Sequence, residues 1–587
     1  MMRSRHDTPT PGASQSNTGI SVLPPALGVR SVAARTAATR ALAFAAAAVL
    51  GITSSITLAQ SATLSGTVTS IEEGAMEGVL VSAQKTGSTI SVTVVSDAQG
   101  RFSFPAAKLA PGDYALRTRA AGFDLDGPAT ATVAAQAGAP LNLKLKKTRD
   151  LAAQMTNSDW IASAPGTARQ KTALLNCVGC HALERVMRSN YTSDQFLKIV
   201  LPRMQAYVNQ SIPEAPQLRK GERLLEERGD QRVQVYKELG DYLAQINLSA
   251  GDKWSYELKP APRPKGRATR AVYTEYDLPR KVIQPHDVIL DNQGIAWYSS
   301  FGEQKIGRVD PVTGAVKEFN VGISKPDFPT GVLALRTDRA GELWIGNMYQ
   351  ASIARFDRKT EKFQAYGPAP QDNLASTQLN MVAAMNSHVD GKVWTQNNGF
   401  AGVHRLDLAT GKMETWAPFK DAKEPHNIYD VISDSKNNAY FTDFRQRHIG
   451  RIDAKTGEVK LFATPTEGSS PRRGTMDAQD RLWFGEYRGH RIGMFDTKTE
   501  QFKEWLVPTP YSAPYDVILD KNEHAWTGSM TTDRIARLDT KSDQITEYLL
   551  PRSTNIRRVF VDNSTSPVTF WVGNNHGASV LKLEPLD

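Results

Sequence analysis

Two cysteines are all that this chain of 587 residues contains, and they lie three positions apart. This scarcity excludes the disulfide framework that stabilises many small secreted domains. Beyond residue 52 the chain lacks an apolar run near the ~20 residues that a membrane-spanning helix needs. Neither sign of charge dominates, because the net charge of +9 falls to about +5 without residues 1–59 and their five arginines and one aspartate. So mild an excess of positive charge is not typical of nucleic-acid-binding proteins. The length of the chain predicts about three or four domains.

The start of the chain has the pattern of a secretory signal. Residues 41–52 form an apolar run, preceded by arginines and followed by small residues up to Ala59. A membrane anchor is the alternative, but the run is much shorter than the ~20 residues that cross a membrane. No twin-arginine pair precedes it. We expect a Sec-type signal peptide over residues 1–59 and a mature protein that is periplasmic or otherwise exported, with no membrane span.

Both cysteines lie in the pentapeptide Cys177-Val178-Gly179-Cys180-His181, which has the spacing that attaches a c-type haem. Two thiols at this spacing can each form a thioether with a haem vinyl group, and the adjacent histidine can coordinate the iron. A thioredoxin-like redox pair would need a βαβ context and leave the histidine without a role, and a disulfide would be strained at this spacing. We therefore predict one covalent haem c, attached to Cys177 and Cys180, with His181 as the proximal iron ligand.

The segment around this motif, residues 150–250, has the periodicity of helices. One helix is expected to run through the pentapeptide to Met187, a second follows the capping-box pattern Thr192–Gln195, and a third spans Val233–Ile246. The third helix resembles the C-terminal helix of small cytochrome c domains, and the resemblance covers residues 160–248. It implies a compact α-helical cytochrome c domain around one haem.

The second iron ligand is expected to be a methionine, because His181 is the only histidine between residues 7 and 285. Met204 lies on the apolar face of a predicted helix and is the preferred candidate, although an ordinary core methionine is the alternative. Met187 is only six residues after His181 and is expected on the proximal side. The loop before the last helix, residues 212–229, contains no methionine, which leaves a five-coordinate iron open.

Residues 62–147 alternate apolar and polar side chains between frequent turn signals, which predicts a small antiparallel β-sandwich. Asp97–Gly100 and Pro111-Gly112 have the residues that tight turns require. The segment closely resembles the carboxypeptidase regulatory-like domain, a family with a prealbumin-like β-sandwich. We expect a structural or docking role, with carbohydrate binding as the alternative. The motifs that carry the resemblance are Gly66–Val68, Gly78–Val81, Asp97–Phe104, Leu109–Tyr114 and Ala121–Phe123.

From Tyr273 onward one unit recurs. An aromatic residue returns every 43 to 50 residues, and an acidic residue follows each one thirteen positions later. This is the period of four-stranded propeller blades, and the strand-like runs argue against helical arrays. We predict a seven-bladed β-propeller over residues 272–587, preceded by a proline-rich linker over residues 251–271. The aromatic residues are Trp297, Trp344, Trp394, Tyr440, Trp483, Trp526 and Trp571, and the acidic ones are Asp310, Asp357, Asp407, Asp453, Asp496, Asp539 and Glu584.

The last repeat lacks a fourth strand. Thr274–Leu278, at the start of the propeller, matches the outer strand Thr546–Leu550 and can supply it. The ring is therefore expected to close by pairing its two ends, which leaves no open edge. The strands expected in the first blade are 286–290, 295–298, 305–309 and 316–319.

Lys305–Asp310, His448–Asp453, Arg491–Asp496 and Leu482–Glu486 resemble the streptogramin B lyase (virginiamycin B lyase) family of seven-bladed propellers. The resemblance implies that a cyclic depsipeptide is opened by elimination. It also implies a magnesium ion and a histidine and glutamate set on neighbouring blades near the central axis.

Only part of that catalytic set has a match in this chain. His426 resembles the histidine on the metal side and Glu486 the glutamate, which makes them the candidate catalytic residues. Arg472 and Arg473 stand where a second histidine is expected, and an arginine cannot act as a general base at neutral pH because its pKa exceeds about 12. The alternative for His426 and Glu486 is a polar lining of a solvated channel mouth.

The corresponding loops of other blades present His286, Tyr515, Arg557 and Arg558. Together with Arg472 and Arg473, these residues predict a basic ring at one mouth of the channel, suited to an anionic ligand or partner. Asp407–Trp416 resembles the tryptophan-docking turn of quinoprotein dehydrogenases. Such a turn fits any strand corner of this propeller, and those enzymes usually have eight blades, so a quinone cofactor is not preferred.

Taken together, the segments predict an exported c-type haem protein in electron transfer. Its propeller would recognise a substrate or a redox partner, either a protein or a small-molecule donor. The alternatives are a streptogramin B lyase-like enzyme with an accessory cytochrome and a non-catalytic binding protein. If the chain is part of an enzyme, an oxidoreductase component is preferred over a lyase.

Overall fold

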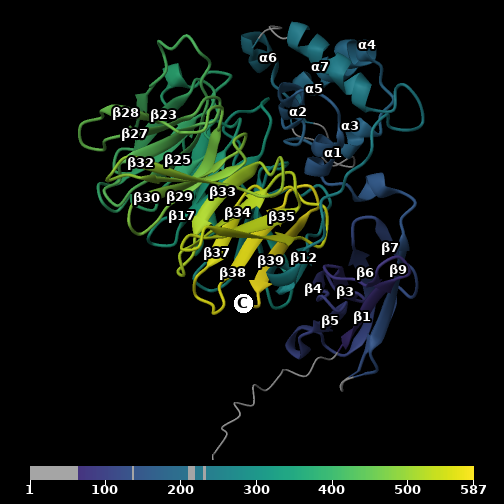
Figure 1. The fold of residues 1–587 in the computed structure, drawn as a ribbon. Coiled ribbons are helices and arrows are strands. Elements are labelled where there is room, and N and C mark those ends of the chain that lie inside the picture. Colours follow the sequence, from purple (N-terminus) through teal and green to yellow (C-terminus); the bar gives the residue numbers. More distant parts are fainter. Residues whose placement is uncertain (1–63, 135–137, 209–217, 229–232) are drawn as a thin grey trace, which may run out of the picture. The chain divides into compact units, whose positions relative to one another are not determined.

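The computed structural model describes residues 64–134, 138–208, 218–228 and 233–587. Along the chain these residues form strands, then helices, then a long series of small sheets (Figure 1). The predicted signal peptide, residues 1–59, lies outside the described residues. Among the residues that are described, no helix combines the length and the apolar character that crossing a membrane requires.

Two β-sheets make up the N-terminal region, which confirms the β-sandwich predicted over residues 62–147. The strands are β1 Leu64–Ser70, β2 Gly74–Ala75, β3 Leu80–Lys85, β4 Ile90–Val95, β5 Arg101–Phe104, β6 Gly112–Arg119, β7 Phe123–Leu125, β8 Thr130–Val133 and β9 Leu141–Lys147. One sheet has the order β2-β1-β9-β7, with β5 also paired to β1, and the other contains β4-β3-β6-β8. Apolar side chains of both sheets, such as Val68 and Val81, share one buried core.

The expectation of a purely antiparallel sandwich is wrong at one pair of strands. β1 and β9 run parallel, with Gly66 opposite Leu141. The two main chains approach so closely that a Cβ atom at residue 66 would lie 1.7 Å from the Leu141 carbonyl oxygen. Glycine at this position permits the close approach, and the pairing joins the first and last strands of the sandwich.

Short helices dominate the next segment. The α-helices are α1 Asn157–Ser163, α2 Ala168–Leu174, α3 Glu184–Met187, α4 Ser193–Gln195, α5 Leu201–Ala206, α6 Glu222–Arg228 and α7 Val233–Ile246, with a β10 Tyr207–Val208 and β11 Leu218–Arg219 pair. α4 begins at the predicted capping box of Thr192 and Gln195. A π-helical turn, Phe196–Val200, joins it to α5, where Pro202 lacks the amide that a regular helix needs. The assignment of this segment as a cytochrome c domain stays a prediction.

The helix predicted to run through the pentapeptide is interrupted there. α2 ends at Leu174 and α3 begins at Glu184. Between them, the Cys177 amide donates to the Leu174 carbonyl at 3.0 Å and the Cys180 amide to the Cys177 carbonyl at 3.0 Å, which are turn-type bonds. The Val178 and Gly179 carbonyls accept hydrogen bonds from propeller side chains instead of continuing a helix.

Six propeller blades are four-stranded antiparallel sheets with their strands in chain order. Their strands are β13 Pro285–Leu290, β14 Ala296–Ser300, β15 Lys305–Val309, β16 Val316–Asn320; β17 Val332–Thr337, β18 Leu343–Asn347, β19 Ser352–Asp357, β20 Lys362–Tyr366; β21 Val382–Ala383, β22 Lys392–Asn397, β23 Gly402–Asp407, β24 Met413–Trp416; β25 Ile428–Ser433, β26 Ala439–Asp443, β27 His448–Ile452, β28 Val459–Ala463; β29 Pro471–Met476, β30 Arg481–Glu486, β31 Arg491–Asp496, β32 Gln501–Leu506; β33 Pro514–Leu519, β34 His524–Ser529, β35 Arg534–Asp539 and β36 Gln544–Leu549.

The seventh blade joins both ends of the propeller. It contains β37 Val559–Asp562, β38 Thr569–Asn574, β39 Ser579–Pro585 and the early strand β12 Ala271–Asp277. Tyr276 pairs with Val580, which confirms that the segment around Thr274–Leu278 supplies the missing strand. The other edge of β12 pairs with β4 of the sandwich, so one eight-stranded sheet contains both. Main-chain hydrogen bonds therefore join the sandwich to the propeller.

The segment predicted as a linker, residues 251–271, is bound to its neighbours. The Trp254 indole donates to the Met187 carbonyl at 3.0 Å, and the Ala261 amide donates to the Asp159 carboxylate at 2.8 Å. Arg263 donates to a carbonyl of the sandwich, that of Glu77, at 3.0 Å. These bonds hold the chain between the helices and β12.

The repeated aromatic and acidic residues have two separate structural roles. The aromatic residue is buried on the second strand of a blade, and the Trp483 indole donates to Asp477, six residues earlier, at 2.8 Å. In the first six blades the acidic residue begins the turn after the third strand, whereas Glu584 lies within β39 and pairs with Lys108. Asp496 accepts the amides of Lys498 and Thr499 at 2.8 and 3.1 Å, and these bonds lower its pKa.

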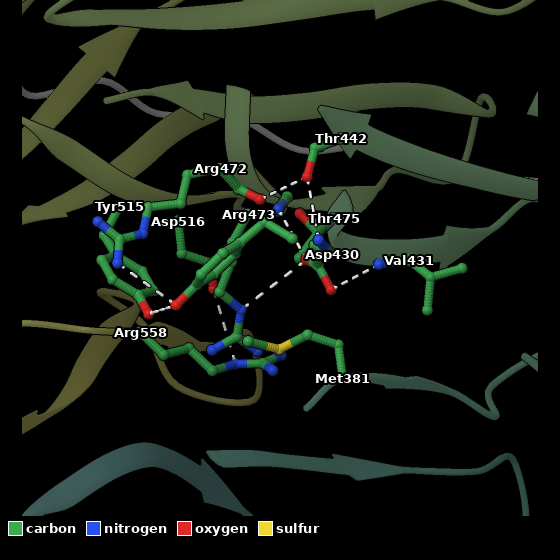
Figure 2. Close-up of polar contacts among 12 residues, drawn as sticks. Met381, Asp430, Val431, Thr442, Arg472, Arg473, Thr475, Tyr515, Asp516 and Arg558 are labelled. Carbon is green, nitrogen blue, oxygen red and sulfur yellow. Dashed lines mark hydrogen bonds and ion pairs between the residues drawn. The ribbon is translucent and has the colours of Figure 1, made fainter. Parts of the chain in front are cut away.

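A network of buried charges lies on the innermost strands of the propeller, and Figure 2 shows Asp430, Asp516, Arg473 and Arg558 of it. Arg473 and Asp287, both fully buried, form two bonds of 2.5 and 2.9 Å. Arg558 lies 3.3 Å from Asp287 and 3.8 Å from Asp516. Burial alone would raise the pKa of Asp287, but Arg473, His286 and Arg558 outweigh it and hold the pKa well below its usual range. The network consists of the acids Asp287, Asp430 and Asp516 and the arginines Arg336, Arg473 and Arg558.

A β-bulge explains why two consecutive side chains of one strand reach this centre. The register of β13 shifts between Pro285 and Val288, and β25, β29 and β33 shift at the same place. Such a bulge interrupts the alternation of side chains between the two faces of a sheet. The first residue of each pair lies at the mouth and the second joins the charge network; the pairs are His286-Asp287, Tyr429-Asp430, Arg472-Arg473 and Tyr515-Asp516.

The basic ring expected at the mouth needs a correction. Arg473 and Arg558 lie in the charge network, where Asp287 pairs with both. Arg472 and Arg557 lie among aromatic rings at the mouth. The ring is therefore much less basic than the sequence suggested.

Replacing Arg473 with methionine should lower the free energy of unfolding by about 3–5 kcal/mol, because Asp287 would remain buried with its main partner removed. Denaturant titration at neutral pH measures this loss, and the exposed Arg339→Met should change stability by less than about 0.5 kcal/mol. The stabilisation by Asp287 is present above its unfolded pKa of about 3.9 and is lost as the pH falls through the lower folded value. The difference between the parent and R473M should therefore shrink below about pH 4, and equal stability at neutral pH would contradict this account.

Candidate functional site at the mouth of the propeller

Arg472 is the central side chain of the mouth. Its guanidinium group lies 4.1 Å from the Tyr515 ring centroid and 4.4 Å from that of Tyr487, with Tyr429 and Phe444 each at 4.7 Å. The side chain is buried, and burial would lower its pKa. The neighbouring tyrosines outweigh burial and raise the pKa above the ordinary value, so Arg472 stays charged inside an aromatic cage.

His286 connects this cage to the charge network. Its Nδ1 lies 2.8 Å from Asp287 and its Nε2 lies 3.2 Å from the Tyr515 hydroxyl, which in turn contacts the Tyr429 hydroxyl. Burial lowers the pKa of His286 to about 4, and Asp287 only partly opposes that effect. The imidazole is therefore neutral at pH 7 and acts as a link between fixed neighbours.

The pentapeptide lies against this same mouth. Tyr487, from the Arg472 cage, donates its hydroxyl to the Leu175 carbonyl at 3.1 Å. Asn555 donates to the Val178 carbonyl at 3.0 Å, and Arg557 donates to the Gly179 carbonyl at 2.7 Å. Side chains next to the last blade therefore hold the main chain of the motif, and Tyr487 of another blade holds the residue two positions before it, although more than three hundred residues separate the partners in the sequence.

Further contacts attach the adjacent helix α1 to the propeller. The Ser158 amide donates to the Thr531 carbonyl at 2.9 Å, and the Asn157 amide group donates to the Met530 carbonyl at 3.3 Å. Asn157 also accepts the Leu183 amide, just after the motif, at 2.7 Å. The Asn157 side chain thus links α1, the segment just after the motif and the loop after β34.

The side chains of the motif suit covalent attachment better than dithiol redox chemistry. No disulfide joins Cys177 and Cys180, and Cys177 is buried. Burial, with a smaller effect of Cys180, raises the pKa of the Cys177 thiol to about 12. A redox-active pair needs a lowered thiol pKa, so this environment disfavours the thioredoxin-like interpretation.

His181 has a defined orientation. Its Nδ1 lies 2.9 Å from the Ala182 carbonyl oxygen, and burial lowers the pKa of the ring. A neutral imidazole that donates through Nδ1 keeps Nε2 available to a metal. Within the described part of the chain, Nε2 of His181 makes no hydrogen bond. Both cysteines and His181 therefore fit the predicted haem.

Met204 and Met187, the two methionines considered as the second iron ligand, have contrasting surroundings. Met204, on α5, is 39% exposed. Met187 is fully buried, and its sulfur lies 3.8 Å from the Tyr256 hydroxyl. Neither arrangement supports an iron ligand by itself, so the proposed role of Met204 stays a prediction.

Glu486 lies at the end of β30 with both carboxylate oxygens buried and, among the described residues, without a hydrogen-bond partner. Burial is the main cause that raises its pKa to about 9, and Glu504 adds to the effect. The carboxyl group is protonated at pH 7 and cannot act as a general base there. Arg472, on the neighbouring β29, is equally unsuited to that role.

His426 lies with a different set of residues. Its ring stacks on Phe419 with centroids 3.9 Å apart, and its Nδ1 lies 2.7 Å from the Asp443 carboxylate. His448 Nδ1 lies 3.4 Å from the same carboxylate oxygen. The potential ligand atoms of these three residues are within 4.8 Å of one another, so they could hold a divalent metal. Sequence reasoning missed Asp443 and His448, which flank the turn between β26 and β27.

Sequence reasoning also missed His576, in the turn between β38 and β39. Its Nε2 is buried and, within the described ranges, has no hydrogen-bond partner. Asn575, its neighbour, accepts a bond from Arg557 at 3.3 Å. The sequence signal was weak, because the equivalent turn of the fifth blade has its histidine, His490, at a different distance from the repeated tryptophan.

Beyond the charge network, the channel opens into a cavity of about 1050 Å³. Arg336 and Arg558 of the network line it, together with apolar residues further along the innermost strands, such as Ile289, Ile432 and Ile518. The network therefore separates this cavity from the mouth that holds the pentapeptide.

Comparison with known proteins gives similarity for two of the three segments. Residues 63–146 match the carboxypeptidase regulatory-like domain, and residues 429–585 match the virginiamycin B lyase family. The pentapeptide lies outside both matches. No curated protein matches the chain.

Solved structures similar to the chain include a streptogramin B lyase (22% identity, 55% of this chain and 99% of the other, TM-score 0.46). A catalytically inactive virginiamycin B lyase from Staphylococcus aureus with quinupristin has 21% identity, with 53% and 99% covered and a TM-score of 0.45. The extracellular domain of a putative one-component system from B. thetaiotaomicron has 17% identity, with 51% and 40% covered and a TM-score of 0.41. From the family matches, the N-terminal sandwich is similar to carboxypeptidase regulatory-like domains and the propeller is similar to virginiamycin B lyase.

Proposed function

We propose that this chain is an exported c-type haem protein that transfers electrons, and that its propeller recognises the substrate or redox partner. The observation that carries the proposal is the attachment of the pentapeptide to the mouth of the propeller by Asn555 and Arg557, with Tyr487 bonded to Leu175 just before it. A structural turn without a prosthetic group would give the paired cysteines and the adjacent histidine no role. The predicted signal in residues 1–59 supports export, where c-type attachment and such a partner would be found.

Each residue of the motif has a task in this proposal. Cys177 and Cys180 would hold the haem through thioethers, and His181 would bind the iron through the nitrogen that is not directed at Ala182. When bound, the haem supplies the exchange of single electrons. Arg557 and Arg472 would provide positive charge for the acidic groups of the haem or of a partner.

The mouth explains how recognition and electron transfer would be joined. Tyr487 belongs to the Arg472 cage and bonds to the Leu175 carbonyl, so a ligand that reorders the cage would act on the main chain two residues before the motif. His286 stays neutral, and its bonds to Asp287 and to the Tyr515 hydroxyl connect the cage to the charge network. A substrate or partner at this mouth would therefore lie next to the redox centre.

Full-length protein made with c-type maturation machinery should contain one covalent haem per chain. The double variant Cys177→Ala, Cys180→Ala should lose all covalent haem, because the thioethers need both thiols. Haem staining after denaturing electrophoresis and the visible spectrum of the reduced pyridine complex measure attachment. Val178→Ala alters the same pentapeptide without touching a thiol and should retain the haem. A parent protein without haem, or with haem that is extracted by denaturant, would overturn the proposal.

A lyase is the second candidate, favoured by the match of residues 429–585 to the virginiamycin B lyase family. The surroundings of Glu486 oppose it, because a carboxyl group with a pKa of about 9 is protonated at neutral pH. We expect no magnesium-dependent ring opening of a streptogramin at pH 7, measured by chromatography of the linear product, and no difference between the parent and Glu486→Gln. Turnover that disappears in E486Q would instead support the lyase.

A further inference from the structure

The turn that contains His576 is attached to the pentapeptide by two routes. Arg557 donates from the same guanidinium nitrogen to the Gly179 carbonyl at 2.7 Å and to the Asn575 side chain at 3.3 Å. In the second route, the Asn575 amide donates to the Asn555 carbonyl at 3.3 Å, and the Asn555 side chain donates to the Val178 carbonyl at 3.0 Å. The residue next to His576 is therefore fixed to both central residues of the motif.

The ring of His576 has a nitrogen without a partner. Its Nε2 is buried and makes no hydrogen bond among the described residues. A buried polar atom left unpaired is unfavourable and calls for an explanation. The bonds of Arg557 described above hold the turn of this nitrogen against the pentapeptide that ends in His181.

Other side chains near the motif are already engaged. His286 has a partner at each ring nitrogen, and the Met187 sulfur faces the Tyr256 hydroxyl. Met204 is 39% exposed, whereas an iron ligand inside a haem pocket would be shielded from water. The buried Nε2 of His576 differs from all of these, because a bond to a metal would satisfy it.

We infer that His576, from the last blade of the propeller, is the second protein ligand of the haem iron, together with His181. The inference rests on the proposed function, since it requires a haem on the pentapeptide. Two imidazole ligands give the iron a lower reduction potential than a histidine and a methionine, so the propeller would set the potential as well as the recognition. The ligand set also departs from the methionine expected from the sequence.

The test compares the full-length parent with His576→Ala, His576→Met and Met204→Leu after the covalent haem content of each has been measured. In the parent, the ferric spectrum and electron paramagnetic resonance should show low-spin iron without the far-red absorption of a methionine–iron bond. H576A should become high-spin and return to low-spin when imidazole is added. H576M should gain the methionine band and a higher reduction potential. M204L should match the parent.

The outcomes distinguish a failure of the inference about His576 from a failure of the proposed function. A parent with covalent haem whose methionine band disappears in M204L would overturn the inference and leave the proposed function standing. High-spin iron in the parent would indicate five-coordinate iron, which would also overturn the inference and leave the proposed function standing. A parent without covalent haem would overturn both. Circular dichroism shows whether H576A folds. If it does not, H576M serves as the test because methionine keeps the bulk of the side chain. An H576M spectrum identical to that of the parent would contradict the inference.

Discussion

The pairing of buried charges in the centre of the propeller is the constraint on which the rest of the structure depends. Asp287 and Arg473 have no access to water, so each must find its counterion inside the channel. Asp287 and Arg473 come from β13 and β29, which are far apart in the sequence, and their bonds fix the relative position of the innermost strands. Because a β-bulge places the preceding residue of each strand at the mouth, the same bonds position His286 and Arg472.

The composition of that mouth decides which chemistry the propeller can support. A charged arginine held over four aromatic rings and a neutral histidine held between two partners are rigid groups for recognition, and neither is poised to move a proton. The protonated carboxyl of Glu486 belongs to the same pattern. The propeller thus resembles virginiamycin B lyase in fold, while its mouth is occupied by contacts to the pentapeptide. Function follows these contacts more closely than it follows the fold.

Features of the chain that depend on local order or on a regular period could be predicted from the sequence. The blade period, the closing strand near Thr274–Leu278, the capping box at Thr192 and the bounds of α7 all belong to this group. Contacts between distant segments could not be predicted. The parallel pairing of β1 with β9 depends on Gly66 meeting Leu141, and the break in the helix at the pentapeptide depends on Asn555 and Arg557. Arg473 and Arg558 were counted as a basic surface because their acidic partners lie on other strands.

Those distant contacts also change how the pentapeptide itself is understood. The segment of residues 150–250 supplies the two thiols and His181, but the carbonyls of Val178 and Gly179 are held by the last part of the propeller. Arg557 holds both Gly179 and the turn that carries His576, so one side chain sets the distance between the motif and that turn. The resemblance to small cytochromes implies a second ligand in the loop before the last helix, but the loop of residues 212–229 contains no methionine. If His576 of the propeller supplies the second iron ligand, this one contact explains both the missing methionine and the unpaired ring nitrogen.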